Sequence, residues 1–106
     1  MKTELQEQLF KKYPDIFVQR HLPKTETAMC YGICCPDNWY DLINILCHHI
    51  QIYQINYNKK NENKINCEAT QVKQKFGGLR FYVNIENDYI KGLINMTESM
   101  SKIIKE

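Results

Sequence analysis

The stretch at residues 72–83 reads VKQKFGGLRFYV and places two runs of strand-forming residues on either side of a glycine pair. Two glycines suit a two-residue hairpin turn, because such a turn requires positive φ at both central positions. We therefore predict a hairpin over about 68–75 and 79–85, with Gly77 and Gly78 as its turn.

The register that follows from this turn separates a mainly apolar face from a cationic one, because side chains alternate between the two faces of a strand. The apolar face receives Val72, Gln74, Phe76, Leu79, Phe81 and Val83. The cationic face receives Lys73, Lys75, Arg80 and Tyr82. In this register Lys73 lies opposite Tyr82 and Lys75 lies opposite Arg80. A like-charge pair across two strands is destabilising unless an anion offsets it.

The cationic face is therefore the candidate ligand-binding site. Lysines hold phosphate as point charges, arginine holds it through two hydrogen bonds, and Tyr82 could stack on a base. Tyr40 is added to the site, because it lies at the start of a predicted helix, where anions are attracted and an aromatic ring can stack on a ligand. The alternative interpretation is a solvated face that is kept polar to prevent aggregation through the sheet edge.

Periodic apolar residues predict three helices, at about 3–13, 38–56 and 88–105. The residues expected to cap them are Thr3 (with Gln6 completing a capping box), Asp37 or Asn38, and Asn87 or Asp88. A further short strand is predicted within 28–33.

These elements predict an α+β fold, in which a small antiparallel sheet is packed by two or three helices in a single domain spanning 1–106. The second and third helices are expected to cover the apolar face of the hairpin. The open edges of so small a sheet could pair across a two-fold axis, which predicts a homo-oligomer, either a dimer or a larger assembly.

The composition is that of an ordinary soluble protein, with 43% hydrophobic and 25% charged residues among 106. A net charge of +2 is too small to indicate nucleic-acid binding by itself. No apolar run approaches the ~20 residues of a transmembrane helix, and the N-terminus lacks the apolar stretch of a signal peptide. We therefore predict a cytoplasmic protein whose five cysteines are reduced.

Metal-binding and catalytic patterns are incomplete. Cys30 and Cys34 have the spacing of one zinc-ligand pair, but the second pair is missing. Cys47 precedes His48 and His49 but lies beside the apolar face of its helix, which favours a core residue over a nucleophile. No carboxylate pair or Ser/His/Asp arrangement suggests catalysis. We predict no catalytic residue, no metal site and no cofactor.

Three segments carry a resemblance to a known family: KKYPDIF at 11–17, CPDNWYDLINILC at 35–47 and QVKQKFGGLRFYV at 71–83. Together they resemble small proteins encoded by bacteriophages and prophages, in which a Gly-Trp-x-x-Leu-Ile helix start precedes a Val-Lys-x-Lys-Phe-Gly-x-Leu-Arg-Phe-Tyr hairpin. Asn38 stands where these relatives usually have glycine. The resemblance implies a phage accessory protein that acts in the host cytoplasm against a host defence.

Three functional hypotheses follow. The first is a non-enzymatic, oligomeric protein that binds an anionic, nucleotide-like ligand and could sequester a defence signal. The second is a protein-interaction module whose hairpin docks on an acidic host defence protein and inhibits it. The third, ranked below these, is a nucleic-acid-binding protein, which would lose affinity steeply with salt.

Overall fold

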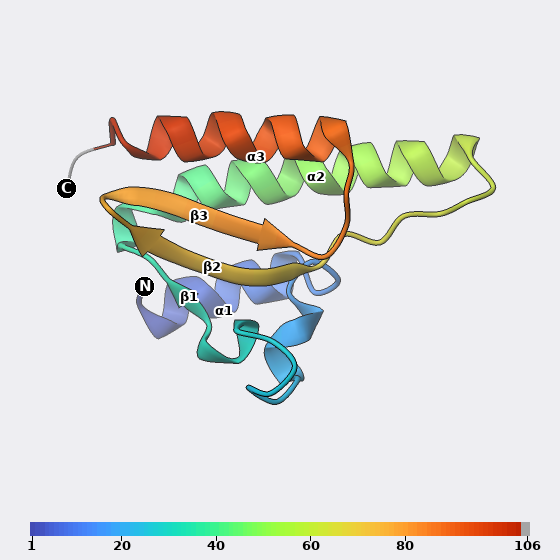
Figure 1. The fold of residues 1–106 in the computed structure, drawn as a ribbon. Helices are drawn as coiled ribbons and strands as arrows, with labels where there is room; N and C mark the ends of the chain where they lie inside the picture. The colour runs from blue at the N-terminus through green and yellow to red at the C-terminus, as the bar shows by residue number, and fades with distance from the viewer. Residues whose placement is uncertain (105–106) are drawn as a thin grey trace.

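A computed structural model describes residues 1–104 and has the α+β fold that the sequence predicts. Its helices are α1 (Thr3–Lys12), α2 (Tyr40–Lys60) and α3 (Asp88–Ser101), with short 3-10 helices η1 (Val18–His21), η2 (Met29–Tyr31) and η3 (Asp37–Trp39). Its strands are β1 (Ile33–Cys34), β2 (Ala69–Lys75) and β3 (Gly78–Val83). Helices α1 and α2 lie behind the sheet, and α3 runs along β3 (Figure 1).

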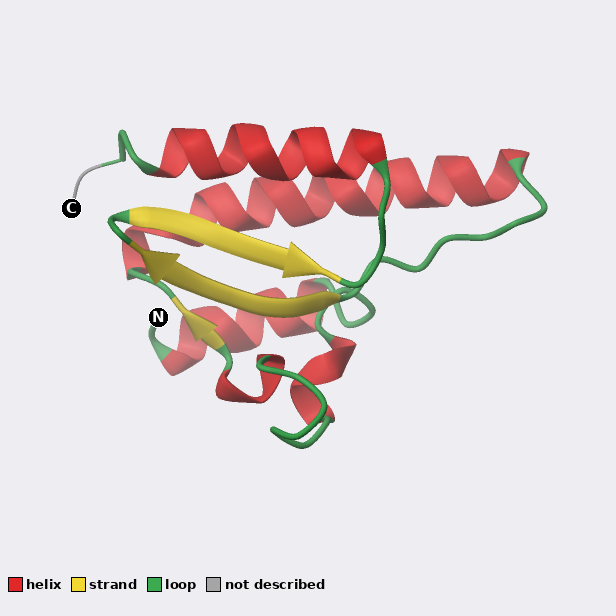
Figure 2. Ribbon diagram, viewed as in Figure 1, coloured by secondary structure: helices red, strands yellow, loops and turns green. Residues whose placement is uncertain are grey.

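The three strands form a mixed sheet in the order β1-β2-β3, so the prediction of a purely antiparallel sheet is wrong. Strands β2 and β3 form the predicted antiparallel hairpin, whereas β1 pairs parallel to β2 (Figure 2). The strand predicted within 28–33 is largely incorrect, because residues 29–31 form η2 and the strand begins at Ile33. Parallel pairing needs no local turn, so nothing nearby in the sequence signals it.

The hairpin turn lies one residue earlier than predicted, at Phe76 and Gly77, which have φ values of 53° and 74°. Gly78 is the first residue of β3, where a Cβ atom would come within 3.2 Å of the Lys102 side chain. A side chain at position 78 would therefore require the Lys102 side chain to shift by a few tenths of an ångström. Phe76 accepts the positive φ at the tip of the turn, where its side chain is 90% exposed instead of on the apolar face.

The shifted turn changes the cross-strand pairs. Lys73 lies opposite Arg80 and Lys75 lies opposite Gly78, so the predicted pairs Lys75–Arg80 and Lys73–Tyr82 are wrong. Moving a two-residue turn by one residue displaces each pairing by two positions, which returns every strand residue to the same face. The predicted division into two faces therefore survives the error for the strand residues.

The inner face of the hairpin packs into a cluster of buried residues to which all three α-helices contribute. Phe17 joins α1 to the sheet, because its ring centroid lies 5.3 Å from that of Phe10 and 6.5 Å from that of Phe81. The sheet contributes Ile33, Ala69, Val72, Leu79 and Phe81, and the helices contribute Leu9, Phe10, Trp39, Ile43, Leu46, Cys47, Ile50, Ile90 and Ile94. Tyr13, the residue that follows α1, also belongs to the cluster. The predicted cover by the second and third helices is confirmed, and α1 adds to it.

Side chains from the helices occupy backbone groups at both edges of the sheet. On β3, the Leu79 N–H donates to Ser101 Oγ at 2.8 Å and the Phe81 N–H donates to Glu98 Oε2 at 2.9 Å. On β1, the Ile33 N–H donates to Gln6 Oε1 at 2.9 Å. These groups are not free to pair with a second sheet, so the predicted reason for oligomerisation through open edges does not hold at these positions.

Two of the predicted helix starts are corrected. The N-cap of α1 is Lys2, so the predicted cap at Thr3 is wrong. The Lys2 backbone N–H donates to Asp37 Oδ1 at 2.7 Å, so Asp37 bonds the start of α1 and not the start of α2. Residues 37–39 form η3, and α2 begins at Tyr40. Asn87 caps α3 as predicted, since its Oδ1 accepts from the Ile90 N–H at 3.0 Å.

The helix ends also differ from the prediction. Helix α2 continues to Lys60 rather than ending near 56, because Asn58 bonds both the N–H and the carbonyl of Ile65 and so ties the helix to the returning loop. Helix α3 ends at Ser101, and Lys105, the predicted last residue, lies outside the described residues. Within residues 1–104, the helices are too short or too polar to cross a membrane.

Candidate functional site

The candidate site is the hairpin outer face, which we define as the side chains of Gln71, Lys73, Lys75, Arg80 and Tyr82. Residues that pair across adjacent strands point to the same side of a sheet. Lys73 pairs with Arg80 on β3 and with Cys34 on β1, so these three residues form one row across the sheet. Ile33 and Cys35 are buried and Cys34 is exposed, which agrees with this alternation.

Arg80 lies at the β3 end of the row and is half-buried. Its Nη1 donates to the Leu79 carbonyl oxygen at 3.0 Å, which folds the guanidinium back along its own strand. Within residues 1–104 the ion pair that meets a 4 Å limit is Lys2 with Asp37, at 3.8 Å. Lys73 and Arg80 therefore lie side by side without a carboxylate of the described chain against either one.

Lys75 extends the cationic row toward the turn. It is exposed, lies opposite Gly78, and places its Nζ 5.5 Å from the centroid of the Phe76 ring. A contact of this length between exposed groups contributes about 0.5 kcal/mol. Lys75 is thus the most exposed of the three cations, and holding its long side chain in one rotamer would cost more entropy.

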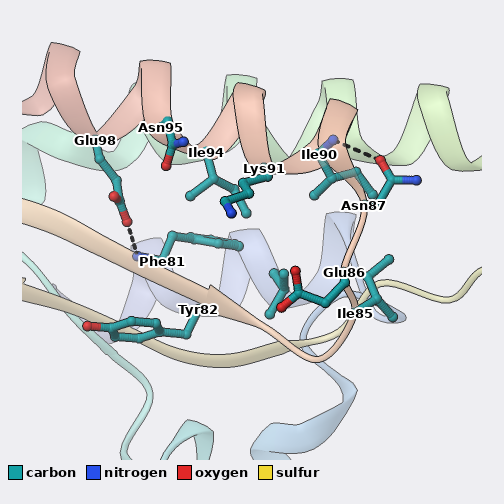
Figure 3. A pocket seen from close by; sticks show the side chains of 11 residues that line it. Phe81, Tyr82, Ile85, Glu86, Asn87, Ile90, Lys91, Ile94, Asn95 and Glu98 are labelled. Atoms are coloured by element: carbon teal, nitrogen blue, oxygen red, sulfur yellow. Dashed lines mark hydrogen bonds between the residues drawn. The ribbon is translucent and has the colours of Figure 1, made fainter.

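Tyr82 lies next to a cleft of about 240 Å³ between β3 and α3. The cleft has an apolar floor that includes Phe81, Ile90 and Ile94, and Lys91 and Glu98 stand among its polar residues. Figure 3 shows the Tyr82 ring running along the strand, away from this floor, while Glu98 reaches down to the Phe81 N–H. Tyr82 is 44% exposed, so its ring remains available on the outer face.

Tyr40 is not part of this arrangement. Its hydroxyl donates to Gln8 Oε1 at 2.9 Å, and Lys12 Nζ lies 5.8 Å from its ring centroid, so Tyr40 packs against α1 on the helical side of the sheet. The sequence placed Tyr40 correctly at a helix start but could not show which face of the sheet that start lies on.

The cysteines divide between the core and the surface. Burial raises the pKa of the Cys35 and Cys67 thiols to about 12, and it raises the pKa of the fully buried Cys47 thiol further. A protonated, enclosed thiol is a poor nucleophile, so Cys47 is a core residue, as its place in the sequence indicates. In the described part of the chain, no three His, Cys, Asp or Glu side chains come together as metal ligands.

Sequence reasoning missed Cys34 and the residues of α3 that border the site. Cys34 joins the row only through the parallel pairing of β1 with β2, for which a two-residue strand leaves no periodic signal. Glu98 and Ser101 were placed on a helix but not against β3. The i, i+3 spacing of these two polar residues, at the edge of an apolar helical stripe, is the one signal that could have suggested a common partner.

Comparisons with protein-family models, with curated proteins and with solved structures gave no match to this chain.

Proposed function

We propose that this chain is a non-enzymatic binding protein that recognises an anionic partner through the hairpin outer face. The observation that carries the proposal is the direct pairing of Lys73 with Arg80, with no carboxylate of the described chain against them. Like charges opposite each other on two strands destabilise a sheet, so the pair costs stability in the free protein. An anion bound between them would remove that repulsion.

The open shape of the face favours a protein surface that carries carboxylates. Small-molecule sites are concave and enclose most of their ligand. Five clefts in the described chain have other residues as their lining, and Lys73, Lys75 and Arg80 belong to none of these five. Three cations on an exposed sheet instead match the polar, complementary surfaces of protein complexes. The resemblance to phage-encoded proteins makes a host defence protein in the bacterial cytoplasm the proposed partner.

A nucleotide-like ligand is the second candidate, and the position of Tyr82 favours it. Tyr82 lies two residues from Arg80 on the same face of β3, so one ligand could place phosphate on the cations and a base on the ring. The neighbouring cleft of about 240 Å³ is smaller than the ~300 Å³ at which ligand pockets usually begin, so it could hold only part of such a molecule. Nucleic acid ranks third, because the net charge is +2.

The test compares Lys73→Ala and Arg80→Ala with Lys24→Ala, which removes one positive charge from an exposed position away from the hairpin. The unmodified protein would be immobilised and exposed to bacterial lysate. Any host protein recovered in a fixed ratio to it would be purified, and its affinity for the unmodified protein and for each variant would be measured. We expect both hairpin variants to weaken that binding by roughly 30-fold or more, while Lys24→Ala does not.

The unmodified protein and the three variants would also be examined by native mass spectrometry with cyclic dinucleotides, cyclic trinucleotides and ADP-ribose. Binding that depends on Arg80, in the absence of a protein partner, would support the nucleotide alternative. If neither a protein nor a nucleotide binds in an Arg80-dependent way, the hairpin outer face is a solvated surface and the proposal is wrong.

A further inference from the structure

Helix α2 carries a regular stripe of residues on the side that faces away from the core. The stripe consists of Asp41, Ile45, His48, Ile52, Ile55 and Lys59, which we call the α2 outer stripe. Its members are separated alternately by four and three residues, the spacing of the a and d positions in a coiled coil. All six are exposed, and the three isoleucines are 55%, 43% and 46% exposed in chain order.

The stripe is unusual for a surface helix because its centre has no charge. Between Asp41 and Lys59, α2 contains no Asp, Glu, Lys or Arg residue. The opposite side of the same helix supplies Ile43, Leu46 and Ile50 to the core. A helix that is apolar on both sides is typically buried on both sides. The core covers one side, and in the described chain the other side faces solvent.

The neighbouring helix continues the apolar surface. Helices α2 and α3 lie alongside each other (Figure 1), and the rings of Tyr53 and Tyr89 stack with their centroids 4.3 Å apart. Met96 and Met100, at successive turns of α3 on the side of Tyr89, are also exposed. Large exposed apolar patches on soluble proteins mark interaction surfaces, and their centres are depleted of charge.

We propose that the α2 outer stripe is the interface of a homodimer in which α2 packs antiparallel to α2 of a second copy across a two-fold axis. The stripe is complementary to itself in this orientation. With the axis midway along the stripe, Asp41 lies opposite Lys59 of the second copy, and Ile45 lies opposite Ile55. His48 then faces Ile52, which places a d position against an a position, as antiparallel coiled coils require.

The opposite charges at the two ends of the stripe favour a second copy of α2 as its partner and an antiparallel orientation of the two helices. A parallel pair of α2 helices would place Asp41 against Asp41 and Lys59 against Lys59, which is repulsive. The antiparallel pair instead puts an opposite charge at each end of an uncharged centre. The 19 residues from Asp41 to Lys59 span about 27 Å.

This interface does not depend on the proposed function of the hairpin, since it uses a different surface. It also replaces the sheet edges as the route to an oligomer, because side chains from α1 and α3 already bond backbone groups there. Two-fold pairing through one continuous helix is an isologous contact, which closes at the dimer and does not propagate into fibres.

The first test measures mass by sedimentation velocity over a range of micromolar concentrations. We expect the unmodified chain to sediment as a dimer of 12.7 kDa subunits. Ile52→Glu would place a charge at the centre of the interface twice and weaken the dimer by at least roughly 30-fold. Val18→Glu is the matched control, since Val18 is also 43% exposed but lies on η1. Its dimer affinity should not change.

The second test exchanges the charges at the ends of the stripe. Asp41→Lys alone or Lys59→Asp alone should weaken the dimer by roughly 3- to 10-fold, because each creates two like-charge contacts across the axis. The double variant should regain the original affinity. Circular dichroism would verify that each variant is folded. If Ile52→Glu does not fold, the single and double charge variants test the proposal by themselves.

Three outcomes would overturn the proposal: an unmodified chain that stays monomeric at all these concentrations, a dimer that persists in Ile52→Glu, or a double variant as weak as the single ones.

Discussion

The two faces of the hairpin differ in what holds their side chains in place, although they are built from alternating residues of the same two strands. Phe81 is buried and packs against Phe17, whereas its neighbours Arg80 and Tyr82 lie on the outer face. On the inner face the buried side chains Val72, Leu79 and Phe81 belong to the cluster to which the helices contribute, whereas Gln74 is exposed. On the outer face the position of a side chain depends only on the strand pairing. We therefore expect stability to depend on the inner face and binding to depend on the outer face.

The largest expected effect comes from removing the central aromatic ring of the inner face. Phe81→Ala should lower the free energy of unfolding by about 3–5 kcal/mol, because it removes the packing against Phe17 and leaves a cavity. Tyr82→Ala, one residue along the chain, should cost less than about 1 kcal/mol. Urea unfolding followed by circular dichroism measures both. Equal losses for the two variants would remove the distinction between the faces.

The next effect concerns the support of the β3 edge. Ser101 is buried, and its hydroxyl accepts from the Leu79 N–H while it donates to the Glu98 carbonyl oxygen. Ser101→Ala should cost about 1–3 kcal/mol, since it leaves a buried N–H without a partner. Ser99→Ala, at an exposed position of the same helix, is the control. A small effect at both positions would mean that water reaches the β3 edge.

Alkaline pH should sharpen the same contrast through the cysteines. Burial raises the pKa of Cys35 and Cys67 to about 12 from the ordinary value of 9.0. Above about pH 9 the unfolded chain therefore releases these protons while the folded chain keeps them, so the folded state binds more protons and stability falls as pH rises toward 12. The loss should be about 1 kcal/mol per thiol at about pH 10.

The measurement for the thiols is the difference in unfolding free energy between about pH 8 and about pH 10. Cys67→Ala should reduce this difference, whatever its effect on stability at neutral pH. Ser99→Ala, which removes no thiol and changes an exposed position of α3, should leave the difference unchanged. A Cys67→Ala variant with the full pH dependence would contradict the burial argument.

The smallest expected effect is a gain, at the turn where the two faces meet. Phe76 has a φ of 53°, a conformation that costs a residue other than glycine about 1–2 kcal/mol. Asn-Gly is a preferred sequence for turns of this kind. Phe76→Asn should therefore raise the free energy of unfolding by up to about 1 kcal/mol, as measured by the shift of the urea midpoint. A loss of stability would show that the exposed ring makes contacts that hold the turn.

Much of this fold could be predicted because its signals are local. The apolar spacing of α2 and α3, the Asn87 cap and the alternation along β2 and β3 all operate within a few residues. The turn was misplaced by one residue because Gly77 and Gly78 are equally suited to positive φ. The tight approach of the Lys102 side chain, which follows α3, favours a small residue at 78, and this contact is not visible in the sequence.

The candidate site was predicted in part for the same reason. The sequence correctly divided Lys73, Lys75, Arg80 and Tyr82 from the inner face, and that division survived the wrong register. It could not place Tyr40, whose neighbours Gln8 and Lys12 come from another helix.

By itself, the sequence determined which elements form and which side of each one is apolar, because helix and strand periods are properties of consecutive residues. The tertiary structure decided which cation lies opposite Arg80, which strand completes the sheet, and which side chains occupy its edges. It also decided that the uncharged side of α2 faces solvent. These outcomes depend on contacts between residues far apart in the chain, and a local pattern of residues does not specify such contacts.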